Sequence, residues 1–311
     1  MKTLICIPVF NGCKYIKNSL DSCIKQTIKT ETWVFDNCST DNTVEIVNSY
    51  CDKHDNIKIF HNEKNLGRTG NWNRCLDKFM ESKYEYIKFL FPGDEIYSNC
   101  IEKVEEIFQK NNNLGAVFFS YKFISNAGQS SIDRPYNQDK LFNSNEITKI
   151  QLSSGSQLGA IICNVYSKNA IKNNRFNLNL ISKVDFDIKV LEHYSLYYLD
   201  ECLALFLKEA HNTFDSAVSP FGYFEFSYAS TKEFERIKKT DRFTKKEFYE
   251  IEQKQILKSM KDQFIFMNIK TSVILLFFNF KRIFYLLMKF LYLKSKIKSF
   301  IKINKSKNTN K

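Results

Sequence analysis

Residues 3–12 read TLICIPVFNG and residues 32–43 read TWVFDNCSTDNT, and these two stretches decide the fold. Each stretch is a short apolar run that ends in polar residues, and the chain between them has the pattern of an amphipathic helix. A strand, a helix and a second strand in this order indicate a βαβ crossover with parallel strands.

The same alternation continues along the first two hundred residues. It predicts further strands at 57–61, 86–91, 115–121 and 157–166, and one or two more within 195–207. It predicts helices at 14–27, 42–53, 69–82, about 99–110 and 184–193, and an irregular surface excursion at 124–152. Repeated crossovers favour an α/β fold with a Rossmann-like, mainly parallel sheet flanked by helices. From about residue 231 the pattern is wholly helical.

The composition limits the classes of protein. The 311 residues are 43% hydrophobic, which is enough for a large core, and the sparse glycine and proline exclude collagen-like and linker-rich chains. The nine cysteines are odd in number and have no C-x-x-C spacing, and no export signal precedes the first strand. We expect them to be small buried hydrophobes in a reducing compartment, and the protein to be cytosolic.

Polar residues follow each of the first four predicted strands. Asp36 ends the second strand, and Asp94 follows the fourth in the loop Phe91-Pro92-Gly93-Asp94-Glu95. In a parallel sheet the ligand binds beyond the carboxyl ends of the strands, so these carboxylates are expected at one edge. An Asp at the position of Asp36 can accept hydrogen bonds from a base or a ribose. An Asp at the position of Asp94 can hold a divalent cation that bridges two phosphates.

The strand-end motifs resemble those of family-2 glycosyltransferases of the GT-A type. Ile7–Asn11 matches I-P-x-[YF]-N, residues 36–43 match D-[DN]-x-S-T-D-x-T, and Asn65–Gly67 matches N-x-G. The likeness covers residues 3–121 well and extends more loosely to about 207. It implies that the nucleotide is bound by Pro8, Phe10, Asn11, Asp36, Asn65, Gly67, Arg68 and Gly93.

The resemblance also implies a domain arrangement. Residues 1–215 would form the GT-A catalytic domain, with a nucleotide-sugar half at about 1–122 and an acceptor half at about 123–215. Independently of the resemblance, the helical pattern from about residue 231 indicates a C-terminal helical region at 216–311.

Several of these residues also have structural explanations. Asp36 could cap the turn into the next helix, and Asp41 and Thr43 fall where side-chain oxygens satisfy the free N–H groups of a helix start. Asn11 fits a role in shaping the first loop, beside Phe10, which could stack on a base. Arg68 could meet a phosphate or lie in solvent.

The fourth loop departs from the family, whose members carry two or three aspartates there. In this chain Asp94 aligns with the last of them, which the resemblance makes the direct metal ligand. Mg²⁺ needs only one or two protein carboxylates because phosphates and water complete its coordination, so the cofactor is expected to be Mg²⁺ or Mn²⁺. His211 follows the last strand, where relatives have a loop over the diphosphate. It is either a further metal or phosphate contact or an ordinary surface or packed residue.

The catalytic base is expected at the start of a helix. The family pattern E-D-x-[DE]-L corresponds to Val184-Asp185-Phe186-Asp187-Ile188, with Val184 in place of Glu. Residues two apart do not share a helix face, so only one aspartate can be the base. The resemblance favours Asp185 as the base and Asp187 as a structural or acceptor-contacting partner. Alternatively, both are acids that interact favourably with the helix N-terminus.

Two further regions bear on the acceptor and on the membrane. Residues 154–159 resemble the small-residue loop under the acceptor site, which suggests Ser156 and Gly159 as acceptor contacts.

All eleven charged residues after Asp262 are basic, and they supply most of the net charge of +12. A helix at about 268–300 would carry a basic stripe beside a broad apolar face, and its uncharged runs are too short to span a bilayer. Such a helix fits an anionic membrane surface, or it packs on the catalytic domain or on a second subunit. The basic face has almost no interleaved aromatics, which argues against nucleic acid.

The sequence therefore predicts a metal-dependent, inverting glycosyltransferase. It would move a sugar from a nucleotide diphosphate donor, with UDP-sugars favoured by the resemblance, to a lipid-linked or cell-envelope glycan. It would be cytoplasmic and peripheral at the inner face of the cytoplasmic membrane. The alternatives are a polyprenyl-phosphate glycosyltransferase, whose acceptor needs no base, and a non-catalytic protein that binds sugar nucleotides or membranes.

Overall fold

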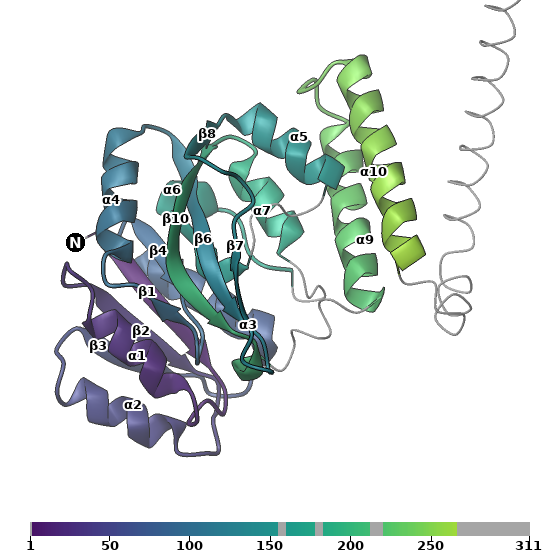
Figure 1. The fold of residues 1–311 in the computed structure, drawn as a ribbon. Helices are drawn as coiled ribbons and strands as arrows, with labels where there is room; N and C mark the ends of the chain where they lie inside the picture. Colours follow the sequence, from purple (N-terminus) through teal and green to yellow (C-terminus); the bar gives the residue numbers. More distant parts are fainter. Residues whose placement is uncertain (1, 155–159, 178–182, 212–219, 266–311) are drawn as a thin grey trace, which may run out of the picture. The chain divides into compact units, whose positions relative to one another are not determined.

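A single sheet organises the part of the chain that the computed structural model describes, namely residues 2–154, 160–177, 183–211 and 220–265 (Figure 1). Its strands are β1 (Thr3–Val9), β2 (Glu31–Asp36), β3 (Ile57–His61), β4 (Tyr86–Phe89), β5 (Glu95–Ile96), β6 (Leu114–Ile124), β7 (Ser130–Asp133), β8 (Lys140–Phe142), β9 (Asn164–Ser167) and β10 (Ser195–Leu207). The strand order is β3-β2-β1-β4-β9-β6-β10-β5, with β7 beside β6 and β8 beside β10.

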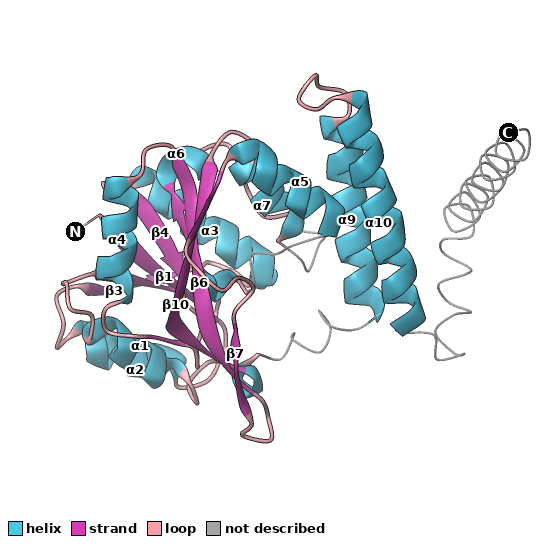
Figure 2. Cartoon of the chain, turned by 45° about the horizontal axis from the view of Figure 1, so that its top comes forward, coloured by secondary structure: helices cyan, strands magenta, loops and turns pink. Residues whose placement is uncertain are grey.

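The described residues also form helices, drawn in cyan in Figure 2. They are α1 (Ile16–Ile24), α2 (Thr43–Cys51), α3 (Gly67–Glu81), α4 (Cys100–Lys110), α5 (Ser144–Ser154), α6 (Lys168–Ile171), α7 (Val184–Leu191), α9 (Pro220–Ile237) and α10 (Lys245–Ile265). Short 3₁₀ turns precede β9 at Ile161–Cys163 and follow β10 at Lys208–Ala210. The predicted α/β fold is confirmed.

The sheet is parallel in its first half and mixed in its second. β3, β2, β1 and β4 run parallel, as the crossovers require, and Val9 lies opposite Asp36 in the register. β9 is antiparallel to both β4 and β6, whereas β6 and β10 are parallel. The carboxyl ends of β1, β2, β3 and β4 therefore meet at one edge, which is where the polar loops follow.

Two sequence expectations were wrong in detail. Residues 124–152 are not irregular, because they contain β7, β8 and most of α5. β7 is exposed along its whole length, so it lacks the alternation of apolar and polar residues that marks a half-buried strand. In the expected strand 157–166, the described part opens with a 3₁₀ turn and becomes strand only at Asn164.

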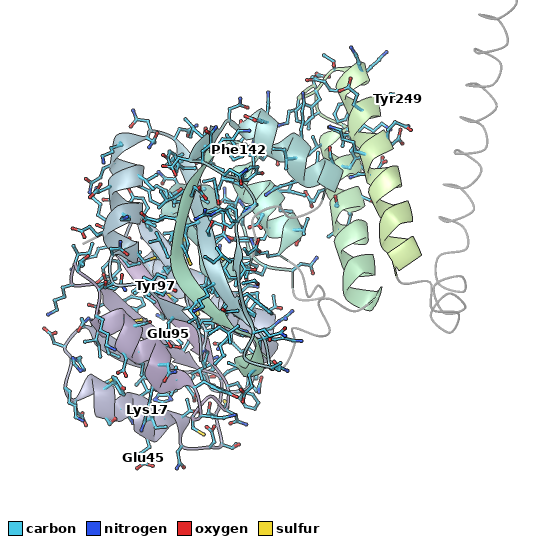
Figure 3. All side chains as sticks on the ribbon, viewed as in Figure 1. Lys17, Glu45, Glu95, Tyr97, Phe142 and Tyr249 are labelled. Atoms are coloured by element: carbon cyan, nitrogen blue, oxygen red, sulfur yellow. The ribbon has the colours of Figure 1, made fainter. Side chains whose placement is uncertain are left out.

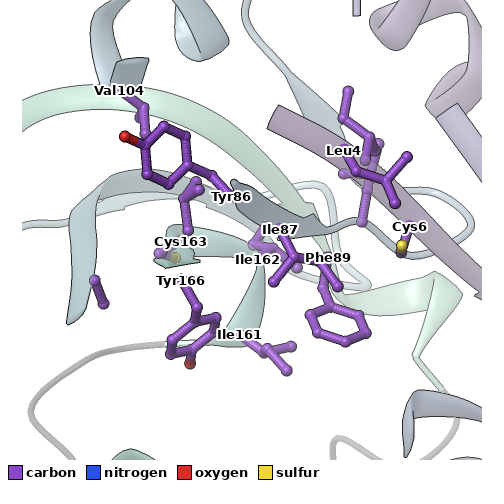
Figure 4. Close-up of a cluster of buried hydrophobic side chains, with 14 of the residues drawn as sticks. Leu4, Cys6, Tyr86, Ile87, Phe89, Val104, Ile161, Ile162, Cys163 and Tyr166 are labelled. Atoms are coloured by element: carbon purple, nitrogen blue, oxygen red, sulfur yellow. The ribbon is translucent and has the colours of Figure 1, made fainter. Parts of the chain in front are cut away.

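Part of the core lies around β4, which has β1 on one side and β9 on the other. Figure 4 shows Leu4, Ile87 and Phe89 with Ile162 and Tyr166, and all five side chains are fully buried. Lys88 lies on β4 and is also fully buried, and its ammonium donates to the carbonyls of Phe89 and Ile162. Burial lowers the pKa of Lys88. The described structure thus places one lysine head group inside the sheet, where two backbone carbonyls satisfy it.

The first C-terminal helix packs against the helices of the second half. Phe234 and Ile237 of α9 form a second buried cluster with Leu152 of α5 and with Val184 and Ile188 of α7. Residues up to Ile251, which include α9 and the start of α10, accordingly belong to one compact unit. Tyr249, labelled in Figure 3, is half exposed on α10.

The proposed membrane helix at 268–300 lies outside the described residues. Within them, no helix combines the length and the apolar character needed to cross a bilayer.

Candidate active site

The loops after β1 and β2 are joined by reciprocal hydrogen bonds. Asn11 takes a left-handed conformation, with φ 52°. Its backbone N–H donates to Ser39 Oγ at 2.9 Å, and its side-chain oxygen accepts from the Thr40 N–H at 2.8 Å. Gly12 N–H donates to Thr43 Oγ1 at 2.8 Å. The loops of the first two strands therefore form one rigid edge, and the contacts of Asn11 and Thr43 are structural.

Asp36 closes β2 with a buried carboxylate. Its two oxygens accept from the Ser39 N–H at 3.2 and 3.3 Å, and His61 Nδ1 lies 3.6 Å from Oδ2. The capping contact that the sequence allowed is therefore present. A single N–H donor shared by both oxygens does not exhaust the acceptor sites of a carboxylate. Asp36 is therefore able to bind a ligand as well as to hold the turn.

The loop after β3 is held to β2 through Asn37, which is not among the site residues predicted from the sequence. Asn37 Nδ2 donates to Asn65 Oδ1 at 2.9 Å, and Asn37 Oδ1 accepts from Leu66 N and Asn62 Nδ2. Gly67 has φ 70°, which a residue with a Cβ adopts only at a cost. Asn65 and Gly67 thus shape this loop, and the several amides beside the strand ends were the sequence signal for it.

Aromatic side chains border the same edge. Phe10 is half exposed directly after β1, and its free ring fits stacking on a base. The Arg68 guanidinium lies over the Trp72 ring, 5.1 Å from its centroid. Pro8 is different, because it is buried within β1 opposite Phe35.

Asp94 is fully buried and is held from several sides. Its Oδ1 accepts from the Leu207 N–H at 3.2 Å and lies 2.8 Å from His211 Nε2. No hydrogen-bond partner is found for Oδ2 in the described structure. Burial raises the pKa of Asp94, and the contact with His211 opposes this shift. A buried carboxylate with one free oxygen is a costly arrangement that a cation would relieve.

The backbone around Asp94 is fixed by Ser19 of α1 and by the segment after β10. Ser19 Oγ lies 2.9 Å from the Phe91 carbonyl and 2.8 Å from the Asp94 carbonyl. Gly93 has φ 94°, and a Cβ placed on it would lie 2.4 Å from the Cβ of Ala210. Gly93 is therefore required for close packing against the segment that carries His211.

The segment with His211 is also tied to the loop after β1. Glu209 accepts from Lys14 Nζ at 2.6 Å and from the Tyr15 hydroxyl at 2.9 Å. The His211 ring stacks on Phe206, with centroids 4.2 Å apart. These contacts hold the imidazole beside Asp94.

Asp94 and His211 fit a divalent cation that also binds phosphate. One carboxylate and one imidazole are suitable ligands, and a bound diphosphate would have to supply most of the remaining oxygens. The described residues contain no cluster of three or more His, Cys, Asp or Glu side chains with metal-site geometry. This arrangement suits a cation that enters together with the nucleotide.

The two aspartates of α7 have different surroundings. Asp187 is fully buried, accepts from the Tyr166 hydroxyl at 2.8 Å and pairs with Lys183 Nζ. Asp185 is also buried, but it has only Lys189 at 3.5 Å from Oδ2, and Oδ1 has no partner among the described residues. Burial raises the pKa of Asp185, opposed by Lys189 and increased further by Glu233. The geometry favours a structural role for Asp187 and leaves one oxygen of Asp185 without a partner among the described residues.

A chain of aromatic rings connects α7 to the Asp94 loop. Phe186 stacks on Phe176 at 4.0 Å between centroids, Phe176 contacts Trp72 at 5.3 Å, and Trp72 contacts Phe91 at 5.3 Å. Neighbours of Asp185 and Asp94 are therefore linked by continuous packing. The expected acceptor contacts Ser156 and Gly159 lie outside the described residues.

Comparison with known proteins gives a consistent picture. The model of the family described as glycosyl transferase family 2 matches residues 4–174. A curated relative, an uncharacterized glycosyltransferase of Mycoplasma genitalium, is 30% identical over 138 residues, which are 42% of this chain and 43% of the relative. The chain thus matches less than half the length of that relative.

Two solved structures show the same fold. Residues 1–349 of TarS from S. aureus, in complex with UDP-GlcNAc, align with a TM-score of 0.64 at 21% identity, over 86% of this chain and 73% of that one. The mannosyltransferase PcManGT of Pyrobaculum calidifontis, in complex with GDP-Man and Mn²⁺, aligns with a TM-score of 0.51 at 14% identity, over 82% of this chain and 68% of that one.

Proposed function

The chain belongs to glycosyl transferase family 2, and from this premise we propose that it is an inverting, metal-dependent transferase that uses a nucleotide sugar. The proposed acceptor is a hydroxyl group of a lipid-linked or cell-envelope glycan. The proposal rests mainly on two buried aspartates, Asp94 and Asp185. Each has one carboxylate oxygen without a partner in the described structure.

We propose that the donor nucleotide binds across the edge formed by the loops after β1, β2 and β3. Asp36 would accept hydrogen bonds from the base or the ribose, and the exposed Phe10 ring would stack on the base. UDP is the favoured nucleotide because TarS, which shares the fold, was solved with UDP-GlcNAc.

Asp94 and His211 would hold the cation, Mg²⁺ or Mn²⁺. The complex of PcManGT with GDP-Man and Mn²⁺ supports the use of a divalent metal by this fold. When bound, the cation would neutralise charge that develops on the departing diphosphate. The Leu207 N–H would keep the Asp94 carboxylate oriented.

Asp185 would act as the general base. As the acceptor oxygen forms its bond to the anomeric carbon, the bond from that carbon to the diphosphate oxygen breaks. The acceptor proton passes to a carboxylate oxygen of Asp185, and the configuration at the anomeric carbon inverts. The raised pKa of Asp185 is favourable, because a carboxylate that is more basic than usual accepts a proton more readily.

Replacing Asp185 by Asn tests the proposed base. Asn has nearly the same shape but cannot take a proton, so transfer should fall by about 100-fold or more, within the range for general base catalysis. Binding of UDP, measured by calorimetry, should be unchanged. Full activity in Asp185→Asn would contradict the proposal and would favour an acceptor that is already an anion, such as a polyprenyl phosphate.

The basic residues beyond 265 support a further proposal, that the chain works at the inner, anionic face of the cytoplasmic membrane. Co-sedimentation with vesicles that contain about one-third anionic lipid should depend on salt, because lysine attraction to lipid headgroups is screened. Equal binding to neutral vesicles would argue against this proposal.

A further inference from the structure

A chain of ion pairs connects Asp185 to helix α9. Lys189 Nζ lies 3.5 Å from Asp185 Oδ2 and 3.6 Å from Glu233 Oε1, so one ammonium serves two carboxylates. Arg236 Nε donates to the second oxygen of Glu233 at 2.7 Å, and its terminal nitrogens form a bidentate pair with Glu192 at 2.6 and 3.2 Å. The five groups alternate in sign from one end to the other.

The two carboxylates that share Lys189 are shielded from water. The side chains of Asp185 and Glu233 are 5% and 7% exposed, whereas Lys189 is 35% exposed. An ion pair at the surface contributes little, but charges removed from water influence one another strongly. The charge of Glu233 therefore acts electrostatically on Asp185, although Glu233 belongs to α9, a helix much later in the chain.

Other charged side chains near α7 are already paired. Lys183, at the start of the helix, is taken up by Asp187. On α5, Lys149 pairs with Glu247 of α10. On α6, Lys168 donates to the Ser82 carbonyl. The titratable groups that act on Asp185 are Lys189, from its own helix, and Glu233, from α9.

We propose that Glu233, acting through Lys189, is a positioning residue for Asp185 and sets how readily Asp185 takes the acceptor proton. This inference rests on the proposed function. Lys189 contacts Asp185 through Oδ2, and Oδ1 has no partner within the described part of the chain. Glu233 draws the ammonium away from Asp185 and prevents a tight ion pair that would make Asp185 a weak base. Helix α9 thereby contributes to the chemistry.

Single substitutions of Lys189 and of Glu233 should shift the acid limb of the pH profile of kcat/KM in opposite directions. Lys189→Met leaves two buried carboxylates without their shared cation, so the limb should move to higher pH. Glu233→Gln removes the like charge, and Lys189 can then pair with Asp185 alone. The acid limb should therefore move to lower pH, and the plateau rate should fall. Each shift should be roughly 1 pH unit, the usual effect of a charge at this distance.

In the double variant Lys189→Met/Glu233→Gln, the acid limb should lie at a pH between those of the two single variants. The matched control is Glu247→Gln, which weakens the ion pair between α5 and α10 without touching Asp185. It should lower thermal stability slightly and leave the pH limb in place. Titration of the Asp185 carboxyl by ¹³C NMR should show the same two shifts, independently of catalysis.

Opposite shifts in the two single variants, with none in Glu247→Gln, would support the inference. If both single variants kept the wild-type limb, or shifted it in the same direction, the inference would be overturned while the role of Asp185 as base would stand. If Asp185→Asn itself were fully active, the proposed function would fail instead.

Discussion

His211 Nε2 lies 2.8 Å from Asp94 Oδ1, although the two residues are 117 positions apart in the chain. The sheet explains this contact. β5 follows Asp94 directly and pairs with β10, where Leu205 lies opposite Glu95. Because β10 ends two residues later, the segment that carries His211 is brought to the Asp94 carboxylate. The pairing of a two-residue strand thus assembles the candidate metal site.

Asp94→Asn should abolish the metal-dependent part of UDP binding. Asn keeps the shape but loses the charge that a divalent cation needs, so kcat/KM should fall by at least about 100-fold, equal to roughly 2.7 kcal/mol. Calorimetry with UDP, with and without Mn²⁺, measures the effect directly. Glu95→Gln removes the adjacent acid and serves as the control. UDP binding that depends on Mn²⁺ in Asp94→Asn would contradict the assignment.

Gly93→Ala should displace the segment after β10. The new methyl group would lie 2.4 Å from the Cβ of Ala210, and φ would remain at 94°. We expect a loss of roughly 1–3 kcal/mol in stability and a weaker response to Mn²⁺. Gly128→Ala has a similar positive φ but no atom within 4 Å, so it should lose stability without losing the Mn²⁺ response. Equal behaviour of the two variants would show that the close approach at Gly93 is unimportant.

Asp36→Ala should weaken UDP binding by roughly 10-fold or more, the effect of losing a hydrogen bond to a charged group. It should also lower thermal stability, because the Ser39 N–H loses its acceptor. Asp55→Asn is the matched control, since Asp55 precedes β3 at the opposite edge of the sheet and pairs with Lys29. Unchanged UDP affinity in Asp36→Ala would place the nucleotide elsewhere.

Asp41 should contribute stability that acid removes. Burial acts to raise the pKa of Asp41, but hydrogen bonds from Thr43 and Cys13 outweigh it and lower the pKa to about 2, from 3.8. Because the folded-state pKa is depressed, the contribution is full above about pH 4 and is lost as the pH falls towards 2. Asp41→Ala should cost about 1–2 kcal/mol in urea unfolding at pH 7, after allowance for solvent screening. The cost should become smaller at pH 3, and a cost that grew on acidification would contradict this assignment.

The sequence was a good guide to the first half of the fold and a poorer one to the second. From β1 to β4 each strand is an apolar run separated from the next by a crossover helix, so the pattern of residues and the topology agree. β8 is a short strand that depends on β10, more than fifty residues further along the chain, and β7 is an exposed strand of four residues in a hairpin with β6. Local pattern carries little information about such strands.

Some features of the candidate site could likewise be predicted from the sequence, and others could not. Strand-end position alone selected Asp36 and Asp94, because the carboxyl ends of parallel strands share an edge. The role of Ser19 could not be read locally, since its hydroxyl meets carbonyls more than seventy residues away. Lys183 was within reach of the sequence, because the i,i+4 spacing to Asp187 is that of a helical ion pair, and it would have marked Asp187 as the paired aspartate.

The sequence by itself determined the family, the parallel half of the sheet and the loops that carry the acids, because each of these follows from residues close together in the chain. Only the tertiary structure decided the surroundings of each carboxylate. It set His211 against Asp94 and placed Glu233 of α9 beside Lys189, the partner of Asp185, and among the described residues one oxygen of each aspartate has no partner. The physical reason is that charge and burial at a carboxylate depend on every segment that packs around it, and those segments come from distant parts of the chain.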